Sequence, residues 1–320
     1  MVVNLGAEEA VAKAIRLANN RKNLEQRLGD VSLDLTIYRK APDKFIRINP
    51  RNQIAIKELE DKLRENYNLD VEFEETKIKG IYQSSNANIG GYIYGVINRF
   101  FNDNYFIQDL ASVICVEELD LEQGNSFLET CAATGFKSIL AYDLMKGKVK
   151  IRALDVDPIK YQRMLAFFKQ FNVGAETDLI DATQFNSNYK FDSILVDAPC
   201  SSEGMNVVYD SDLKKDVGGF GKVVEYSNED IERFSVLQLR LLQKGYGCLK
   251  ENGTLIYATC SLNKIENEGV VIRFLEENKD ASVVNVDMDK YGIKHTSSNL
   301  GIRIIPDKTK GFYFTKIKKT

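Results

Sequence analysis

Histidine is almost absent from this chain, whose 320 residues include only His295. A single imidazole argues against a histidine-rich metal site and leaves carboxylates, lysines and thiols as the groups available for catalysis. The five cysteines are widely spaced and form no C-x-x-C pair, so the sequence predicts neither a disulfide framework nor a zinc site. We therefore expect no metal.

Long hydrophobic runs are also missing, and none reaches the roughly 20 apolar residues that a membrane-spanning helix needs. The first six residues, from Met1 to Gly6, have neither the basic start nor the apolar stretch of a signal peptide. We expect no membrane partner and a cytoplasmic location, with a nuclear or nucleolar one open if the source is eukaryotic. Nothing in the composition suggests an obligate interface, so a monomer is expected.

A large excess of either charge is absent as well, since the formal net charge is -3. The mean hides a basic stretch, because residues 11–57 hold eleven lysines and arginines against four acids. Five lysines follow near the end of the chain (308, 310, 316, 318 and 319). Such a stretch can follow a phosphate backbone, but it can equally be the solvated face of a helix.

The first third of the chain predicts a small α+β unit. A helix is expected over residues 7–28, and the order strand, helix, strand, strand over residues 45–49, 54–66, 71–73 and 78–82. In this unit Phe45, Ile46, Arg47 and Arg51 are candidates for a surface that faces RNA. We place this domain at residues 1–104.

The remaining residues, 105–320, alternate between strands and helices. Strands are expected at 126–130, 149–154, 175–180, 191–196 and 254–259, and helices at 137–146, 159–171 and 228–249. This alternation predicts a doubly wound α/β domain whose parallel sheet carries functional residues at the carboxyl ends of its strands.

Two features at these strand ends predict a nucleoside cofactor. The first is a loop of small residues before a helix, where backbone amides and the helix dipole favour an anionic group. Its residues are Cys131, Ala132, Ala133, Thr134, Gly135, Phe136 and Lys137. The second is Asp155, placed to hold ribose hydroxyls, with Asp181 following the next strand. Each aspartate alone could simply cap a helix.

Two cysteines follow the last two parallel strands, Cys200 in Asp197-Ala-Pro-Cys and Cys260 in Thr259-Cys-Ser. A lone cysteine in such a place is usually a small buried apolar residue, the interpretation we adopt for Cys115 and Cys248. Two of them on strands expected to be neighbours across the switch point indicate instead a pair of thiols that faces one pocket, beside Asp197.

The Asp-Ala-Pro-Cys and Thr-Cys-Ser motifs together resemble those of the RNA (cytosine-5)-methyltransferases of the Nop/Sun type, and Glu266-Asn267-Glu268 adds to the likeness. The resemblance runs from about residue 106 to the end of the chain. It implies a Rossmann-like methyltransferase domain with a mostly parallel seven-stranded sheet. It also implies S-adenosylmethionine as cofactor and RNA as partner.

The resemblance further implies a role for each site residue. Cys260 would attack C6 of cytosine, and Cys200 would remove the C5 proton or help to release the product. Asp197 would contact the cytosine near N3 and also border the cofactor site, whose other residues would be the loop 131–137, Asp155 and Asp181. Lys137 and the adjoining helix end are candidate sources of the positive potential that favours a thiolate.

The cofactor loop departs from the family pattern at Glu129, Thr134 and Phe136, where the family usually has Asp, Pro and Gly. Phe136 puts a side chain where backbone normally approaches the cofactor, which leaves open a non-catalytic RNA-binding or assembly factor. A methyltransferase for protein or small molecules would not explain paired thiols. Because both cysteines and Asp197 are present, we expect an active enzyme. The compact chain favours tRNA as substrate, with ribosomal RNA as the alternative.

Overall fold

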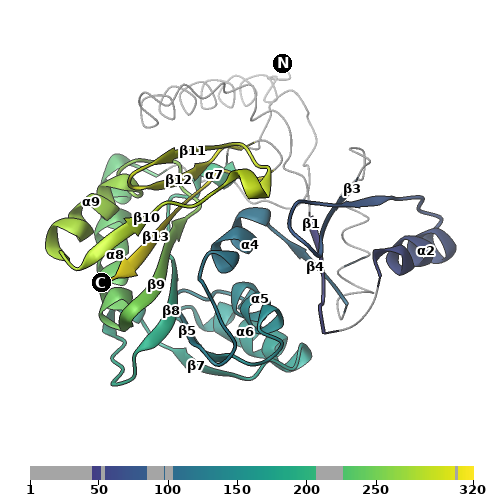
Figure 1. Cartoon of the computed structure of the whole chain (residues 1–320), viewed down its shortest axis with the longest axis horizontal. Helices are drawn as coiled ribbons and strands as arrows, with labels where there is room; N and C mark the ends of the chain where they lie inside the picture. Colours follow the sequence, from purple (N-terminus) through teal and green to yellow (C-terminus); the bar gives the residue numbers. More distant parts are fainter. Residues whose placement is uncertain (1–44, 52–54, 85–96, 98–103, 207–225, 307–308) are drawn as a thin grey trace, which may run out of the picture.

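The computed structural model describes residues 45–51, 55–84, 97, 104–206, 226–306 and 309–320 (Figure 1). The helix expected over residues 7–28 lies outside these ranges. So do eight of the eleven cationic residues of the basic stretch. None of the described helices is long and apolar enough to cross a membrane.

The small unit has the predicted order of strand, helix, strand and strand. It consists of β1 (Phe45–Ile48), α2 (Ile56–Tyr67), β2 (Phe73–Glu75) and β3 (Ile81–Ser84). A fourth strand, β4 (Tyr105–Gln108), pairs with β1, so the antiparallel sheet has the order β2-β3-β1-β4. The sheet therefore draws its last strand from residues that the predicted division places in the second domain.

The candidates for an RNA-facing surface in this unit are corrected by the structure. Phe45, Ile46 and Arg47 are at most 3% exposed, because β1 is covered on both faces by hydrophobic clusters. The Arg47 guanidinium lies 4.2 Å from the ring centre of Phe106 and donates to Asp143 at 2.6 Å. Arg51 pairs with the same carboxylate at 2.7 Å. The sequence predicts a surface position for Arg47 because its buried partner, Asp143, is 96 residues away and local patterns cannot reveal it.

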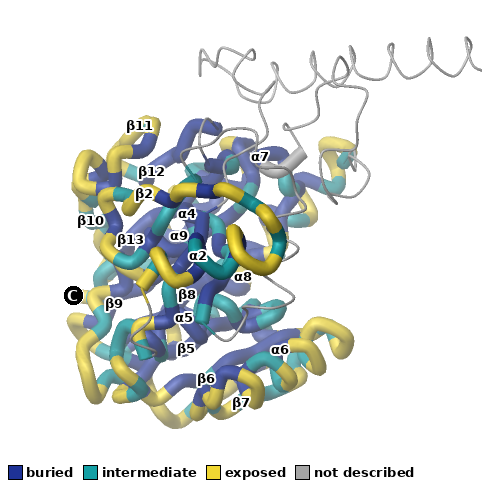
Figure 2. The backbone as a smooth tube through the Cα atoms, turned by 90° about the vertical axis from the view of Figure 1, so that its right-hand side faces the viewer, coloured by how far each residue is buried: buried dark blue, intermediate teal, exposed yellow. Residues whose placement is uncertain are grey.

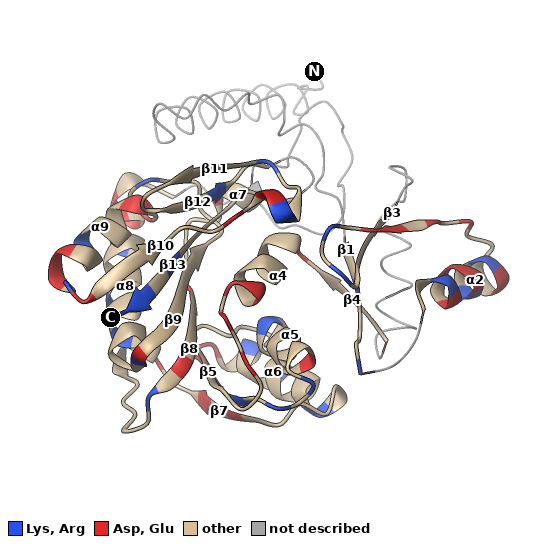
Figure 3. Cartoon of the chain, in the orientation of Figure 1, with Lys and Arg blue, Asp and Glu red and all other residues tan. Residues whose placement is uncertain are grey.

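The helix of this unit is not a basic surface either. Lysine and arginine positions along α2, blue in Figure 3, are interspersed with aspartate and glutamate positions, which are red. Lys57, Lys62 and Arg64 each pair with an acid within the helix. The described part of the small unit thus presents mixed charge, which gives no strong attraction for a phosphate backbone.

The pair between Arg47 and Asp143 joins the small sheet to α5, so we expect Asp143→Asn to be strongly destabilising. Burial lowers the pKa of Arg47, and the Asp143 carboxylate opposes that effect. Removing the carboxylate charge leaves a buried guanidinium unpaired, which typically costs about 3–5 kcal/mol. Chemical denaturation followed by circular dichroism measures the loss.

Glu58→Gln is the matched control, since Glu58 and Lys62 form an exposed pair on α2. Such pairs contribute at most about 1 kcal/mol, so its midpoint should stay close to that of the native chain. Equal midpoints for Asp143→Asn and this control would show that the buried pair does not hold the two parts together.

The large sheet has a parallel half and an antiparallel half. The parallel strands are β5 (Ser126–Glu129), β6 (Lys150–Asp155), β7 (Ala175–Leu179), β8 (Phe191–Asp197) and β9 (Leu249–Thr259). The antiparallel strands are β10 (Ala281–Val284), β11 (His295–Ser298), β12 (Gly301–Ile304) and β13 (Phe312–Lys319). This arrangement confirms the expected methyltransferase-like α/β fold.

The described sheet has nine strands rather than the expected seven. The extra strands arise because β10 and β12 pair with different parts of β13, and β11 pairs with β12. These strands are only four residues long, and β11 is His-Thr-Ser-Ser, without the alternating apolar pattern that predicts a strand. The five parallel strands follow the predicted ranges closely, except that β9 begins five residues early.

Helices cover both faces of the large sheet. On one face pack α4 (Leu110–Glu117), α5 (Phe136–Leu144) and α6 (Pro158–Gln170), and on the other α8 (Asn228–Gly247) and α9 (Glu268–Glu277) (Figure 1). Buried residues follow the central strands, whereas α2 and α6 carry many exposed ones (Figure 2). Cys115 and Cys248 are buried among apolar neighbours, as predicted.

The strand order locates the switch point. Along the sheet the order is β7-β6-β5-β8-β9. From β5 the chain adds β6 and β7 on one side and then returns to add β8 and β9 on the other, so the strand order reverses between β5 and β8. The prediction that the two cysteine-bearing strands are neighbours is confirmed, but they do not straddle the switch point, because β8 and β9 lie on the same side of it. Asp197 and the cofactor loop after β5 are the residues that meet there.

Candidate active site

The two cysteine motifs meet at the carboxyl edge of the sheet. Strands β8 and β9 run in parallel with Asp197 opposite Ala258, so the segments that follow them leave the sheet together. The Sγ atoms of Cys200 and Cys260 lie 2.9 Å apart. Cys200 is 8% exposed, and Cys260 is more accessible. The structure thus brings the two predicted thiols into direct contact.

The surroundings of the two thiols separate their acidities. Hydrogen bonds with Cys200 and Ser202 lower the pKa of Cys260. The hydrogen bond with Cys260 and burial raise the pKa of Cys200 well above its usual value. Cys260 is therefore the thiol that ionises first, while Cys200 keeps its proton and donates a hydrogen bond to the Cys260 sulfur. A thiolate is the nucleophilic form of cysteine.

The Glu266 side chain connects the two cysteine motifs through hydrogen bonds. Its carboxylate is fully buried and accepts hydrogen bonds from the Ser201 backbone and hydroxyl, from the Ser261 hydroxyl and from the Gln238 amide, at 2.5 to 3.0 Å. Ser201 follows Cys200 and Ser261 follows Cys260, so one side chain fixes the backbone after both cysteines. Asn267 further fixes the backbone after Cys260, because its amide donates to the Ser261 carbonyl at 3.0 Å.

A close backbone approach completes this framework. The Gly204 amide donates to the Cys260 carbonyl at 2.9 Å, and the Gly311 amide donates to the Gly204 carbonyl at 3.2 Å. A Cβ at Gly204 would lie 2.0 Å from the Gly311 oxygen, which no side chain can tolerate. Glycine is therefore required where the helix α7 (Glu203–Asn206) passes between Cys260 and the loop before β13.

The predicted cofactor loop joins β5 to α5. Its Ala133 amide donates to Asp155 at 2.6 Å, and the other oxygen of that carboxylate accepts from the Asp157 amide at 2.8 Å. Gly135 has a φ of +79° and lies against Met164 and Phe168, where a Cβ would come within 2.5 Å of the Phe168 ring. The loop is therefore shaped by Asp155 and α6, and it ends at the amino terminus of α5.

The Phe136 ring belongs to an aromatic cluster. Its centre lies 5.0 Å from that of Phe167, 6.4 Å from Phe106 and 6.5 Å from Phe171. Three of these rings come from α5 and α6 or the turn after α6, and Phe106 from β4. The side chain that departs from the family pattern is thus part of the packing between the small sheet and the second domain.

Lys137 and Asp197 form an ion pair at the switch point, with Nζ and Oδ2 2.5 Å apart. Although burial lowers it, the charges of Asp197 and Glu129 hold the pKa of Lys137 above its usual value. Burial raises the pKa of Glu129 to about 7, against the opposing effects of Lys137 and Ser138. The interpretation of Lys137 as the activator of Cys260 gains no support, because its ammonium binds Asp197, and Cys260 is stabilised by Cys200 and Ser202.

The other predicted cofactor residues line the same edge of the sheet. Asp155 ends β6, and the exposed Asp181 follows β7, where it caps a short 3-10 helix by accepting from the Thr183 amide at 2.9 Å. Burial raises the pKa of Cys131 to about 12, which suits packing rather than reactivity. A helix amino terminus, whose amides donate hydrogen bonds, and carboxylates on adjacent strands, which accept them, suit a nucleoside with an amino-acid tail.

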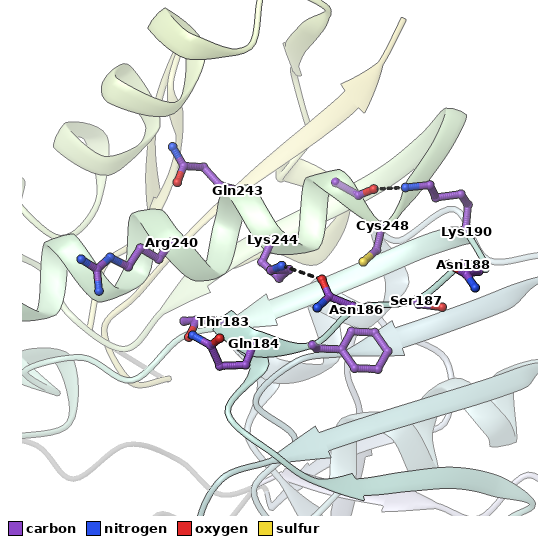
Figure 4. A pocket seen from close by; sticks show the side chains of 12 residues that line it. Thr183, Gln184, Asn186, Ser187, Asn188, Lys190, Arg240, Gln243, Lys244 and Cys248 are labelled. Atoms are coloured by element: carbon purple, nitrogen blue, oxygen red, sulfur yellow. Dashed lines mark hydrogen bonds between the residues drawn. The ribbon is translucent and has the colours of Figure 1, made fainter.

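A polar cavity between α8 and the segment that precedes β8 reaches the opposite edge of the sheet (Figure 4). It measures about 630 Å³ and is lined by Lys190, Lys244 and Cys248 among others. Lys190 immediately precedes β8 and Cys248 precedes β9, so one end of the cavity lies at the amino ends of strands whose carboxyl ends carry the thiols. The lining continues to Thr183, whose amide donates to Asp181, so the other end lies beside a predicted cofactor residue.

Comparison with known families decides the assignment. Residues 116–318 match the model of the family described as 16S rRNA methyltransferase RsmB/F. The chain belongs to this methyltransferase family. S-adenosylmethionine is the cofactor of the family, as the sequence predicted, and the donor set around the cofactor loop fits it.

Individual relatives support the same assignment. The chain is 30% identical over 218 residues to the ribosomal RNA small subunit methyltransferase B of Photorhabdus laumondii, covering 67% of this chain and 46% of the relative. It is 32% identical over 185 residues to the probable enzyme of that name from Bacillus subtilis, covering 57% and 39%. The matched region thus spans less than half the length of either curated relative.

Solved structures share the fold. A methyltransferase homologue from Pyrococcus horikoshii is 25% identical with a TM-score of 0.69, and the match covers 89% of each chain. The NSun6 protein of the same organism, in complex with SFG, an analogue of S-adenosylmethionine, is 16% identical with a TM-score of 0.71, covering 89% and 93%.

Sequence reasoning missed three parts of this site: the hydroxyl of Ser202, the buried amide of Gln238 and the central role of Glu266. Only Glu266 carried a signal, since it stands in the Glu-Asn-Glu triplet that resembles the family. Gln238 lies on α8, 28 residues before its partner, and nothing in its local pattern distinguishes it from other helix residues.

Proposed function

We propose that this protein is an S-adenosylmethionine-dependent RNA (cytosine-5)-methyltransferase with Cys260 as nucleophile and Cys200 as its partner. The observation that carries the proposal is the contact of two thiols with opposite shifts in pKa. Cytosine C5 is a poor nucleophile, and addition of a thiolate to C6 makes C5 enamine-like. Methyl transfer to nitrogen or oxygen needs no such thiol.

Each residue then has one task. The Cys260 thiolate forms a bond to C6 of cytosine, while Asp197 holds the base near N3 and favours protonation there, so that a proton from solvent neutralises the negative charge that addition places on N3. Bound S-adenosylmethionine supplies the methyl group to C5. Cys200 loses its own proton to solvent and, as a thiolate, takes the C5 proton. The electron pair of the C5–H bond restores the C5=C6 bond, the C6–sulfur bond breaks to return Cys260 as a thiolate, and N3 releases its proton to solvent. Lys137 fixes the Asp197 carboxylate throughout.

The cofactor is assigned to the edge of β5, β6 and β7. We infer that residues 131–137 and the amino terminus of α5 hold its amino-acid part, Asp155 its ribose and Asp181 its adenine side. The packing of the Phe136 ring among Phe106, Phe167 and Phe171 supports this assignment, since it directs that side chain toward a packed cluster.

The RNA substrate is proposed from the relatives. Their names point to small-subunit ribosomal RNA, whereas the tRNA preference rests only on the compactness of the chain and stays a prediction. A cytoplasmic location, a monomeric state and the division of the chain at residues 104 and 105 also stay predictions. We propose ribosomal RNA as the substrate to test first.

Methyl transfer from labelled cofactor to RNA, followed by bisulfite sequencing, tests the function. We expect 5-methylcytosine at one or a few cytosines of unmodified small-subunit ribosomal RNA incubated with the full chain and S-adenosylmethionine. Modified tRNA instead would confirm the sequence-based preference and overturn the ribosomal assignment. Cofactor binding without methylation of either RNA would favour the non-catalytic alternative.

A further inference from the structure

Ser202 has a backbone conformation that disfavours serine. Its φ is +58°, in the left-handed region that glycine adopts freely and other residues rarely do. It is two residues beyond Cys200 and two before Gly204, in the segment that joins β8 to α7. Strained residues of this kind gather at functional sites, where the surrounding structure holds them in place.

The strain places the Ser202 hydroxyl beside the nucleophile. Its Oγ lies 3.3 Å from the Cys260 Sγ and 3.4 Å from the Cys200 carbonyl oxygen. While Cys260 is a thiol, its S–H donates to the Ser202 oxygen and the hydroxyl donates to that carbonyl. Once Cys260 is ionised it has no proton to give, and rotation of the hydroxyl turns its O–H toward the sulfur.

We propose that Ser202 is a positioning residue that donates a hydrogen bond to the Cys260 thiolate, both before it attacks and when it leaves. The proposal rests on the proposed role of Cys260 as the nucleophile. A hydroxyl whose hydrogen can point either to a carbonyl or to a thiolate stabilises the ionised form without a nearby cation. Such a donor is needed because the charge of Lys137, the predicted source of positive potential, is paired with Asp197.

The charged and titratable groups around Cys260 support the need for such a donor. Asp197 from β8 and Glu266 from the segment after β9 both raise the pKa of Cys260, and burial raises it further. Cys200 and Ser202 are the two groups that lower it. Cys200 gives up its own proton for part of the cycle, before it takes the C5 proton, so the hydroxyl of Ser202 is the donor that is present at every stage.

Alkylation of Cys260 by iodoacetamide tests the proposal without RNA or cofactor. Peptide mass spectrometry follows this cysteine alone between pH 5 and pH 10 in the native chain, Ser202→Ala and Ser202→Gly. Alanine removes the hydroxyl but keeps the strain, and glycine removes both. We expect both variants to react about tenfold more slowly near pH 7, the scale of one hydrogen bond to a charged group, with the pH profile displaced upward.

Ser187→Ala, on the rim of the cavity at the opposite edge of the sheet, should leave the profile unchanged (Figure 4). An unchanged profile in Ser202→Ala would overturn the proposal. So would native reactivity in Ser202→Gly, because a variant without the hydroxyl would then react as fast as the native chain. A displaced profile in a chain that methylates no RNA would leave Ser202 as the donor and reject only the proposed function.

Discussion

Cys260→Ala is expected to abolish methylation of RNA and to prevent any covalent complex with it. The variant removes the atom that bonds to C6, and without that bond C5 has no enamine character. Loss of a covalent nucleophile typically lowers kcat by about 10⁴-fold or more. Methyl transfer from labelled cofactor gives the rate, and denaturing electrophoresis with RNA containing 5-azacytidine shows the complex.

Cys248→Ala is the control for the loss of a thiol, because Cys248 is buried at the other edge of the sheet. It should form the complex at the native level once its stability has been checked. Cofactor binding by Cys260→Ala, measured by calorimetry, should equal that of the native chain, since no part of the cofactor loop changes. Residual turnover within tenfold of native would remove Cys260 from the reaction.

Cys200→Ala is expected to trap the reaction instead of preventing it. Cys260 can still add to cytosine, but the proton at C5 has no base beside it, so the bond to C6 does not break. Loss of a general base commonly lowers turnover by about 10² to 10⁴-fold. A protein–RNA complex that survives denaturation should therefore accumulate on ordinary RNA, without 5-azacytidine.

The same substitution removes a donor from Cys260. Because the hydrogen bond with Cys200 lowers the pKa of Cys260, alkylation of Cys260 near pH 7 should be slower in Cys200→Ala. Complex formation should be slower for the same reason, but its final yield should exceed that of the native chain. If the native chain accumulates the complex and Cys200→Ala does not, Cys200 is the nucleophile and Cys260 is its partner.

The sequence predicted the central fold because short apolar segments alternate with helical ones and several of them are followed directly by functional residues. Ile194 to Val196 form such a segment in β8, and Asp197 follows it directly. Strands of this kind are covered on both faces, so their hydrophobicity alone marks them. The edge strands β10 and β11 lack that signal, since their residues are partly exposed and their pairing depends on β13 and β12.

The contact between the two thiols was predictable for a similar reason. Residues after adjacent parallel strands leave the sheet at the same edge, whatever the packing elsewhere. The supports of that contact were not predictable, because each depends on a partner distant in the sequence. Glu266 reaches Ser201 across 65 residues, and Gln238 reaches Glu266 across 28. The strain at Ser202 depends on a backbone angle that a serine in the sequence does not reveal.

The central claim is that the bond to RNA forms at Cys260. The most direct measurement maps that bond: the complex with 5-azacytidine-containing RNA is digested with nuclease and protease, and the modified peptide is sequenced by mass spectrometry. The expected result is a single nucleotide adduct on the sulfur of Cys260, with Cys200 unmodified. An adduct on Cys200, or methylation of RNA in the absence of any adduct, would contradict it.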